Sequence, residues 1–211
     1  MDMMNESCSR FLAELASKAP TPGGGGTAAL VGAAGVALCN MVGNLTTGKK
    51  KYAAVEEKIQ ALNAKAETLR KELEALVQED AEAFAPLAAA YGLPKDTPEQ
   101  AADKERVMET ALTRAALVPI KIMQKCLEGI TLAYSYAVDG STMAISDAGC
   151  AAVLCKAALQ AASLNVFVNT KLMTNREFAT ALEHTAEQLL DAGTSYADEA
   201  FHYVNEKLRS K

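Results

Sequence analysis

Two carboxylates lie among apolar residues, where an acid side chain could carry protons. Asp80 stands in the segment 77–84, shortly before Pro86. Asp147 follows Ser146 at the start of a nearly uncharged stretch. An acid among apolar groups is a candidate general acid or base, whereas an acid at a helix start can simply cap the helix. The pattern favours capping for Asp147 and leaves both roles open for Asp80.

A run of four glycines could bind an anion. It follows Thr21-Pro22 and comprises Gly23, Gly24, Gly25 and Gly26. Free N–H groups and the positive dipole end at a helix start attract negative groups, but four glycines also permit a tight turn between helices. Both interpretations stay open. A basic run, Lys49, Lys50 and Lys51, follows the far end of the same expected helix. These lysines either bind an anion or only complement the helix dipole.

Two amides stand four residues apart in an apolar stretch. Asn165 and Asn169 would share one face of a helix. Polar amides inside an apolar helix need hydrogen-bond partners. They therefore either join a buried network or face a ligand.

The sequence offers little to bind a metal ion or a nucleic acid. The five cysteines never form a C-x-x-C pattern, and only two histidines are present. We expect reduced, mostly buried thiols and no metal centre. A net charge of −5 disfavours nucleic acid as a partner.

The elements that hold these side chains are predicted to be helices. The chain contains 41 alanines among 211 residues, 5% aromatic residues and no tryptophan. Alanine is the best helix former and is depleted in strands. With no linker dividing the chain, we expect one all-α domain over residues 1–211.

Periodicity and turn signals predict an up-and-down bundle of six to seven helices. We expect helices over 5–18, 28–43, 51–91, from 98 to at least 118, over 147–169, and from the capping box 174–177 to about 208. Thr27 is the expected N-cap of the second helix. Pro86 should kink or end its helix, and Pro119 should bend the helix that contains it. The Ala/Gly-rich helices 28–43 and 147–169 carry almost no charge, so we expect both to be fully buried.

The uncharged stretch 19–48 has the outline of a membrane span, with three lysines after it. It is mostly Ala and Gly, however, with few of the Leu, Ile and Phe residues that favour insertion. Residues 1–15 include three acids and lack the basic start of a signal peptide. We expect a core helix, no membrane association and a cytoplasmic location.

Seven short motifs follow one another across essentially the whole chain: Pro22-Gly23-Gly24-Gly25, Met41-Val42-Gly43, the basic run ending in Tyr52, Asp80-Ala81-Glu82-Ala83-Phe84, Leu93-Pro94-Lys95-x-Thr97-Pro98-Glu99, Ser146-Asp147 and Asn165-Val166-x-x-Asn169. In this order they resemble the cyclodeaminase/cyclohydrolase family of folate enzymes. The resemblance implies an all-helical homodimer that acts on a tetrahydrofolate substrate and has no metal or prosthetic group.

The resemblance also implies chemistry at the N5/N10 bridge of tetrahydrofolate. A cyclohydrolase interconverts 5,10-methenyltetrahydrofolate and 10-formyltetrahydrofolate, and a cyclodeaminase releases ammonia from 5-formimidoyltetrahydrofolate. The absence of an attached transferase domain slightly favours the first. Both reactions need proton-moving carboxylates, which we assign to Asp80 and Asp147. The expected substrate contacts are Gly23, Gly24, Gly25, Gly26, Lys49, Lys50, Lys95, Asn165 and Asn169.

One departure from the family pattern weakens this assignment. Gly140-Ser141 stands where the family usually shows Gly-Asn, so an amide contact at that position is lost or replaced. A non-catalytic binding module with the same fold therefore remains an alternative, although Asp80, Asp147 and the glycine run are present.

Overall fold

The computed structural model describes residues 3–210, and the regular elements of this part are helices without strands. The α-helices are α1 (Cys8–Leu15), α2 (Gly24–Asn44), α3 (Glu56–Tyr91), α4 (Pro98–Asp139), α5 (Ile145–Thr170) and α6 (Arg176–Arg209). Three short 3₁₀ turns join or precede them: η1 (Met3–Asn5), η2 (Lys50–Val55) and η3 (Thr142–Ala144). The predicted all-α bundle is confirmed.

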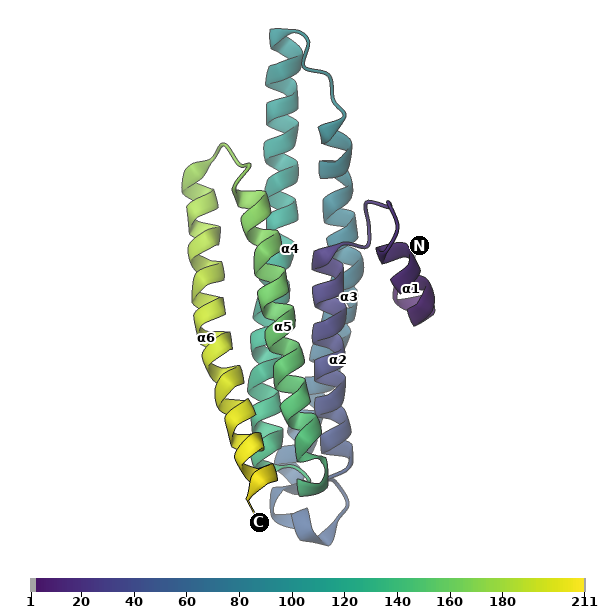
Figure 1. The fold of residues 1–211 in the computed structure, drawn as a ribbon, viewed down its shortest axis with the longest axis vertical. Helices are drawn as coiled ribbons and strands as arrows, with labels where there is room; N and C mark the ends of the chain where they lie inside the picture. Colours follow the sequence, from purple (N-terminus) through teal and green to yellow (C-terminus); the bar gives the residue numbers. More distant parts are fainter. Residues whose placement is uncertain (1–2, 211) are drawn as a thin grey trace.

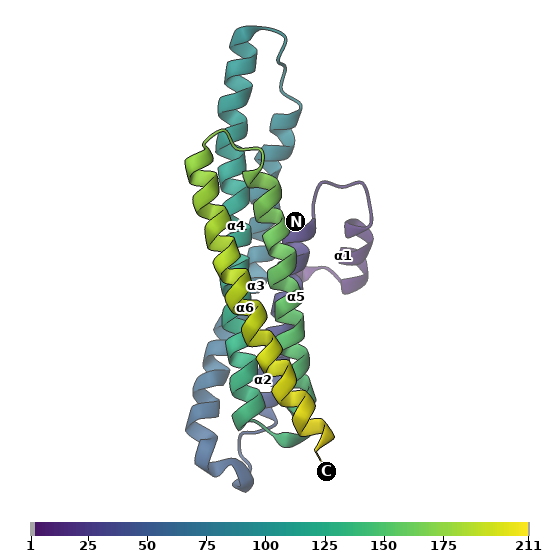
Figure 2. The same cartoon turned by 60° about the vertical axis from the view of Figure 1, so that its left-hand side comes forward.

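The five long helices run up and down along one axis (Figure 1). α2 and α5 lie side by side, α3 packs beside α2, and α6 packs against α4 and α5. The short α1 stands off the side of the bundle, as the turned view also shows (Figure 2). The end with η2 and η3, at the bottom of Figure 1, is called the lower end below.

Small residues allow α2 and α5 to approach closely. A Cβ atom added to Gly35 in α2 would lie 2.7 Å from Cys155 Sγ in α5, closer than such atoms can approach. The contact therefore requires glycine at this position. Fully buried alanines such as Ala29 and Ala152 continue the contact region. The high alanine content thus serves close helix packing as well as helix formation.

Several helix boundaries differ from the prediction. α2 begins at Gly24 with Gly23 as its N-cap residue, and the Thr27 hydroxyl donates to Gly23 O at 2.7 Å instead of capping. The predicted Thr27 cap is therefore wrong. Residues 50–55 form the 3₁₀ turn η2, so α3 starts at Glu56, not near 51.

The two prolines do not interrupt their helices. Pro86 lies inside α3 and Pro119 inside α4, and both helices continue past them. A proline has no N–H group, so the carbonyl four residues before it loses its helical hydrogen bond. For Pro119 this carbonyl belongs to Ala115, and the Asn169 Nδ2 atom from α5 donates to it at 3.1 Å. Tertiary packing thus replaces the missing bond.

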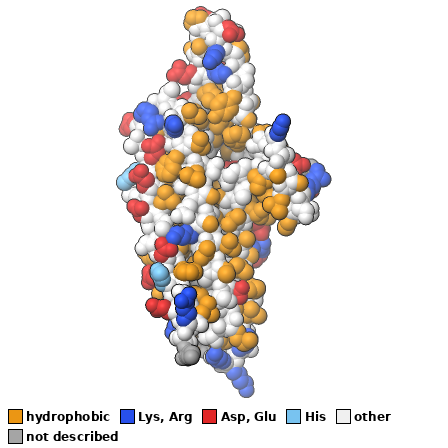
Figure 3. Space-filling view, in the orientation of Figure 1, with side chains coloured by type: hydrophobic (Ala, Val, Ile, Leu, Met, Phe, Trp, Pro, Cys, Tyr) orange, Lys and Arg blue, Asp and Glu red, His pale blue; other side chains and the backbone are white. Residues whose placement is uncertain are grey.

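The prediction that helices 28–43 and 147–169 are fully buried is wrong. Each has one outer stripe that no other described element covers, with exposed fractions of 38% for Met41, 44% for Val153, 68% for Leu164 and 56% for Val168. Hydrophobic side chains accordingly gather over α2 and α5 on the surface (Figure 3). We call this surface the α2–α5 face and define it by these four residues. By length and hydropathy alone, Gly24–Asn44 and Thr142–Thr170 could each span a membrane.

Candidate active site at the start of α2

Asp80 on α3 faces the first turn of α2. Its Oδ2 atom accepts a hydrogen bond from the Gly26 N–H at 2.8 Å. Gly25 makes this approach possible, because a Cβ atom there would overlap the Asp80 carboxylate. The start of α2 thus donates one backbone N–H to a carboxylate of the same chain, and binding of a substrate anion by the glycine run stays a prediction.

Burial raises the pKa of Asp80 above the ordinary value for an aspartic acid. The hydrogen bond from Gly26 acts in the opposite direction, because it stabilises the charged form, but burial has the larger effect. Asp80 therefore holds its proton to a higher pH than an exposed aspartate does. A carboxyl group of this kind is a candidate general acid or base.

A cavity of about 200 Å³ opens beside Asp80. The start of α2 forms one wall, and residues of α3, α4 and α5 form the others. The lining residues include Gly23, Gly24, Gly25, Asp80, Asn165 and Asn169. The structure thus brings together six of the residues that the sequence singled out, with Gly26 bound directly to Asp80.

Both asparagines are fixed by backbone contacts. The Asn169 Nδ2 atom donates to Ala115 O at 3.1 Å and to Asn165 O at 2.8 Å. The Asn165 Nδ2 atom donates to Ala161 O at 2.9 Å, and its amide packs against Gly24. Both asparagines line the cavity, where an amide oxygen can accept a hydrogen bond.

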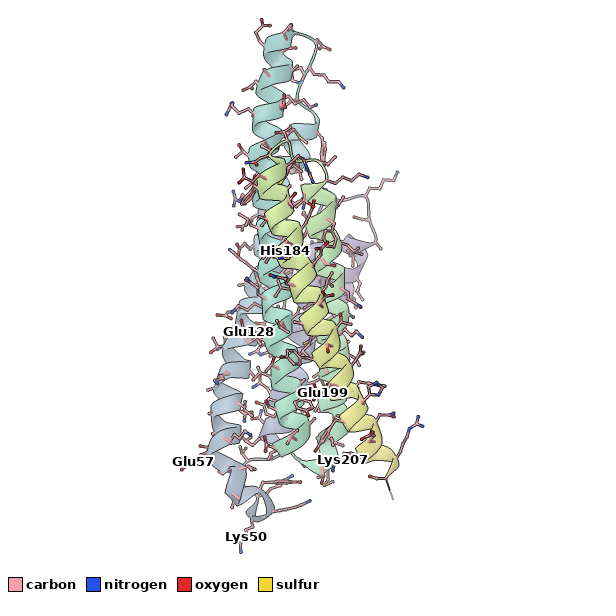
Figure 4. The ribbon with its side chains drawn as sticks, turned by 90° about the vertical axis from the view of Figure 1, so that its left-hand side faces the viewer. Lys50, Glu57, Glu128, His184, Glu199 and Lys207 are labelled. Atoms are coloured by element: carbon pink, nitrogen blue, oxygen red, sulfur yellow. The ribbon has the colours of Figure 1, made fainter. Side chains whose placement is uncertain are left out.

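The remaining predicted site residues lie elsewhere in the chain. Asp147 is half-buried in the first turn of α5, about 27 Å along the helix from Asn165. Lys49 and Lys50 precede or begin η2 at the lower end, where Figure 4 labels Lys50. Lys95 is exposed in the α3–α4 connection and does not line the cavity. Within one chain, none of these four joins Asp80.

The sequence reasoning missed six residues of the cavity wall: Pro20, Thr21, Phe84, Ala115, Pro119 and Val168. Phe84 falls within a motif that was recognised, four residues after Asp80 and hence on the same side of α3. Pro119 gave one usable signal, because a proline there leaves the carbonyl of Ala115 without its helical donor. That Asn169 supplies the replacement donor depends on how α4 and α5 pack.

A second polar cluster lies at the lower end. The Tyr52 hydroxyl accepts from the Thr142 N–H at 3.0 Å and lies 3.3 Å from Thr142 Oγ1. The Lys51 ammonium lies 5.2 Å from the centre of the Tyr52 ring. Hydrogen bonds from Thr142, and next from Ser141, lower the pKa of Tyr52 to about 7.

These features define a class of protein: a helical bundle that holds a buried carboxyl group with a raised pKa beside a small polar cavity. Comparison with known proteins identifies the family. The formiminotransferase-cyclodeaminase family profile matches residues 7–188. The chain belongs to this family.

Similar proteins carry two different activities in their names. A methenyltetrahydrofolate cyclohydrolase from Methylorubrum extorquens is 43% identical over 204 residues, which is 97% of this chain and 98% of that protein. The crystal structure of a formiminotetrahydrofolate cyclodeaminase from Thermotoga maritima superposes with a TM-score of 0.80 at 28% identity, covering 97% of this chain and 96% of that one.

The vertebrate relatives are longer. The formimidoyltransferase-cyclodeaminase of Rattus norvegicus is 30% identical over 195 residues, which is 92% of this chain and 36% of that protein. The chain thus spans about a third of this larger relative.

Proposed function

We propose that the protein is a methenyltetrahydrofolate cyclohydrolase, which interconverts 5,10-methenyltetrahydrofolate and 10-formyltetrahydrofolate. The observation that carries the proposal is Asp80, a buried carboxyl with a raised pKa that lines a cavity together with Asn165 and Asn169. The similarity to the Methylorubrum cyclohydrolase supports it, because the two chains match along nearly their whole lengths.

The geometry supports a reaction with one proton carrier. Asp80 accepts a proton from water as the oxygen attacks the bridging carbon of the methenyl cation. The C–N5 bond then breaks, Asp80 returns the proton to N5, and the new hydroxyl loses its own proton as the formyl C=O forms. One water is consumed and one proton is released. The negative charge of Asp80 also stabilises the cation before attack.

The alternative is the cyclodeaminase reaction, which the Thermotoga structure and the larger relatives favour by name. There N10 attacks the formimidoyl carbon, and a proton must reach the departing nitrogen so that it leaves as ammonia. Asp80 is placed equally well to supply that proton. Both reactions therefore use the same carboxyl, and the substrate distinguishes them.

A single absorbance assay tests both activities. Purified protein is mixed with 5,10-methenyltetrahydrofolate or with 5-formimidoyltetrahydrofolate, and the methenyl absorbance is followed. A cyclohydrolase makes it fall in the first mixture, and a cyclodeaminase makes it rise in the second. A folded protein that gives neither signal would leave the non-catalytic binding module as the function.

We also propose that a second copy of the chain covers the α2–α5 face. The face carries exposed Met41, Val153, Leu164 and Val168, and two copies could meet on it without repulsion between like charges. Two helices about 30 Å long and about 20 Å across offer about 600 Å² per copy, near the lower end for a stable dimer. Val168 also lines the Asp80 cavity, so a second copy on this face would border the cavity.

The dimer would also explain the distant site residues. If two copies pack antiparallel along the α2–α5 face, the lower end of one copy lies beside the cavity of the other. Asp147, Lys49 and Lys50 would then approach the substrate from the second copy. We propose this shared site as the role of these three residues, with the lysines near the carboxylates of the folate tail.

The reaction itself supports two further proposals. Water addition and C–N cleavage transfer no electrons, so we propose that the protein acts without a prosthetic group. Folate one-carbon chemistry and three buried thiols, Cys39, Cys126 and Cys155, are in keeping with a reducing compartment, and we propose the cytoplasm as the location.

A further inference from the structure

The residues that line the Asp80 cavity are of two chemical kinds. Asp80, Asn165 and Asn169 contribute polar side chains, and the glycines at the start of α2 contribute backbone. The remaining helical residues of the lining are apolar: Phe84, Ala115, Pro119 and Val168. A ligand that fills this cavity should therefore combine hydrogen-bonding edges with an apolar face.

Phe84 provides the aromatic surface of the cavity. Among the described residues of the lining, it is the one with an aromatic ring. It follows Asp80 by four residues in α3, so both side chains leave the same side of the helix, about 6 Å apart along its axis. Phe84 packs against the core but stays half-buried. One ligand can therefore contact Phe84 and Asp80 together.

The volume of the cavity limits which part of a folate it can hold. Pockets that hold drug-sized ligands have volumes of about 300–1,000 Å³, and the Asp80 cavity has only about 200 Å³. With the bridging carbon at Asp80, the cavity has room for one of the two rings that the bridge joins. These are the pterin, attached through N5, and the benzoyl ring, attached through N10.

The chemistry of the lining favours the pterin over the benzoyl ring. The pyrimidine part of a pterin is flat and carries N–H donors and acceptors along its edges, whereas the edges of the benzoyl ring are C–H groups. Asp80, Asn165 and Asn169 offer carboxylate and amide groups to such polar edges. Val168 lines the cavity and is 56% exposed, so it marks the mouth, where the benzoyl ring and the tail can leave.

We propose that Phe84 binds the pterin ring of the substrate by stacking on its flat face. The stacked ring would direct N5 and the bridging carbon towards Asp80, one helical turn away, and its polar edges towards the asparagine amides. This assignment rests on the proposed folate function, and it identifies the residue that orients the substrate in the cavity.

The test removes the aromatic ring and keeps an apolar side chain. Dissociation constants are measured for 5-formyltetrahydrofolate and, by competition, for two fragments of it. 6-Methyltetrahydropterin carries only the pterin, and p-aminobenzoylglutamate carries only the benzoyl ring and the tail. In Phe84→Leu we expect 5-formyltetrahydrofolate and 6-methyltetrahydropterin to bind at least fivefold more weakly, the usual effect of losing an aromatic side chain on which a flat heterocycle stacks. Binding of p-aminobenzoylglutamate should not respond.

A matched control lies on α6. Phe178 is also half-buried against the core, but it does not line the cavity. Phe178→Leu should leave the dissociation constants within twofold of wild type, and circular dichroism should show intact helices in both variants. If Phe84→Leu does not fold, Phe84→Met gives the same comparison, because the flexible methionine side chain fills irregular spaces.

The outcomes separate the assignment from the function on which it rests. Unchanged binding of 5-formyltetrahydrofolate by Phe84→Leu, or a loss of affinity confined to p-aminobenzoylglutamate, would overturn the pterin assignment while the wild type still binds and converts folate. Wild-type protein that neither binds nor converts any folate would instead overturn the proposed function.

Discussion

Two opposing effects act on the pKa of Asp80. Burial favours its protonated form, and the Gly26 N–H favours its charged form. Because burial has the larger effect, the carboxyl keeps a proton affinity closer to neutral pH than an exposed aspartate. The same side chain also completes the start of α2, so its chemical and structural roles can be separated by an isosteric change.

Asp80→Asn should lower kcat by about 10²–10⁴-fold, the usual contribution of a general acid or base. The fold should persist, because the asparagine Oδ1 atom can still accept from Gly26. Glu79→Gln is the matched control, since Glu79 is the neighbouring acid and pairs with Lys121 at 2.6 Å on the surface. Absorbance kinetics on both variants check the prediction, and wild-type rates in Asp80→Asn would remove this carboxyl from the mechanism.

The pH dependence of stability should change in the same variant. A carboxyl whose pKa is raised on folding contributes stability at pH values below its unfolded-state pKa, and this contribution is lost as pH rises through the raised folded-state value. Asparagine does not titrate. The free energy of unfolding of the wild type relative to Asp80→Asn should therefore decrease from acidic to neutral pH, as urea titrations at several pH values can measure.

Tyr52 should titrate near neutral pH. Hydrogen bonds from Thr142 lower its pKa to about 7, so a phenolate absorbance step is expected at that pH in the wild type. Tyr52→Phe should abolish the step, and Thr142→Val should move it towards the ordinary tyrosine value of about 10. Tyr91→Phe, a change at an exposed tyrosine, should leave it in place. A step that survives in Tyr52→Phe would assign it to another group.

At the scale of elements, the start of α2 positions the site. Gly23, Gly24, Gly25 and Gly26 are chemically identical, but their surroundings differ. A Cβ atom at Gly25 would overlap Asp80, whereas one at Gly23 would meet nothing within 4 Å. Position 25 therefore requires glycine for steric reasons, and position 23 does not.

Gly25→Ala should displace the Asp80 carboxylate and reduce kcat/KM at least tenfold, because small displacements of a catalytic group are costly. Gly23→Ala should keep activity within twofold. Circular dichroism should show intact helices in both variants, and enzyme assays provide the comparison. Equal activity of the two variants would show that α2 and α3 can adjust to the added methyl group.

The sequence predicted the helices better than their ends. Alanine content, periodicity and turn signals were sufficient for the class of fold and for most elements, and α4 begins with a capping box between Thr97 and Gln100. The sequence placed the start of α2 too late, because local propensity favours Thr27 as the N-cap. In the structure the contact with Asp80 stabilises a helical conformation of the glycines before Thr27. That contact joins positions 54 residues apart, beyond the reach of local rules.

The sequence predicted several residues of the candidate site but not their arrangement in space. Asp80 and the Asn165–Asn169 pair attracted attention as polar groups in apolar surroundings, and the fold places them around one cavity. Asp147 has the same sequence character but lies at the other end of α5. The sequence gives no distance between α2 and the two ends of α5, so it could not show which carboxylate lies beside the glycines.

At the scale of the whole molecule, the proposed pairing of two copies on the α2–α5 face can be tested by mutation. Val153→Glu with Leu164→Glu should convert a dimer into a monomer, because four charges would be buried at a paired face. Leu208→Glu on α6, at a comparably exposed position, should remain dimeric. Light scattering gives the mass of each variant. A monomeric wild type that floats with lipid vesicles would instead assign the face to a membrane.

Mixing two inactive variants tests whether the site is shared. If Asp147 acts from the second copy, Asp80→Asn and Asp147→Asn should each be inactive alone. Random exchange makes half of the dimers mixed, each with one intact site, so about a quarter of the wild-type rate should return. No recovery, despite exchange shown by mass spectrometry, would contradict a site shared between two copies, and an active Asp147→Asn variant would exclude Asp147 from the reaction.

The bond from Gly26 to Asp80 makes one backbone amide a natural probe of the reaction. The charge of the accepting carboxylate polarises that N–H, so the amide resonance of Gly26 should shift whenever Asp80 gains or loses a proton. Glycine nitrogen resonances lie apart from most others in an NMR spectrum. The protonation state of the carboxyl can thus be followed in the unmodified protein, without a dye, a substrate analogue or a mutation.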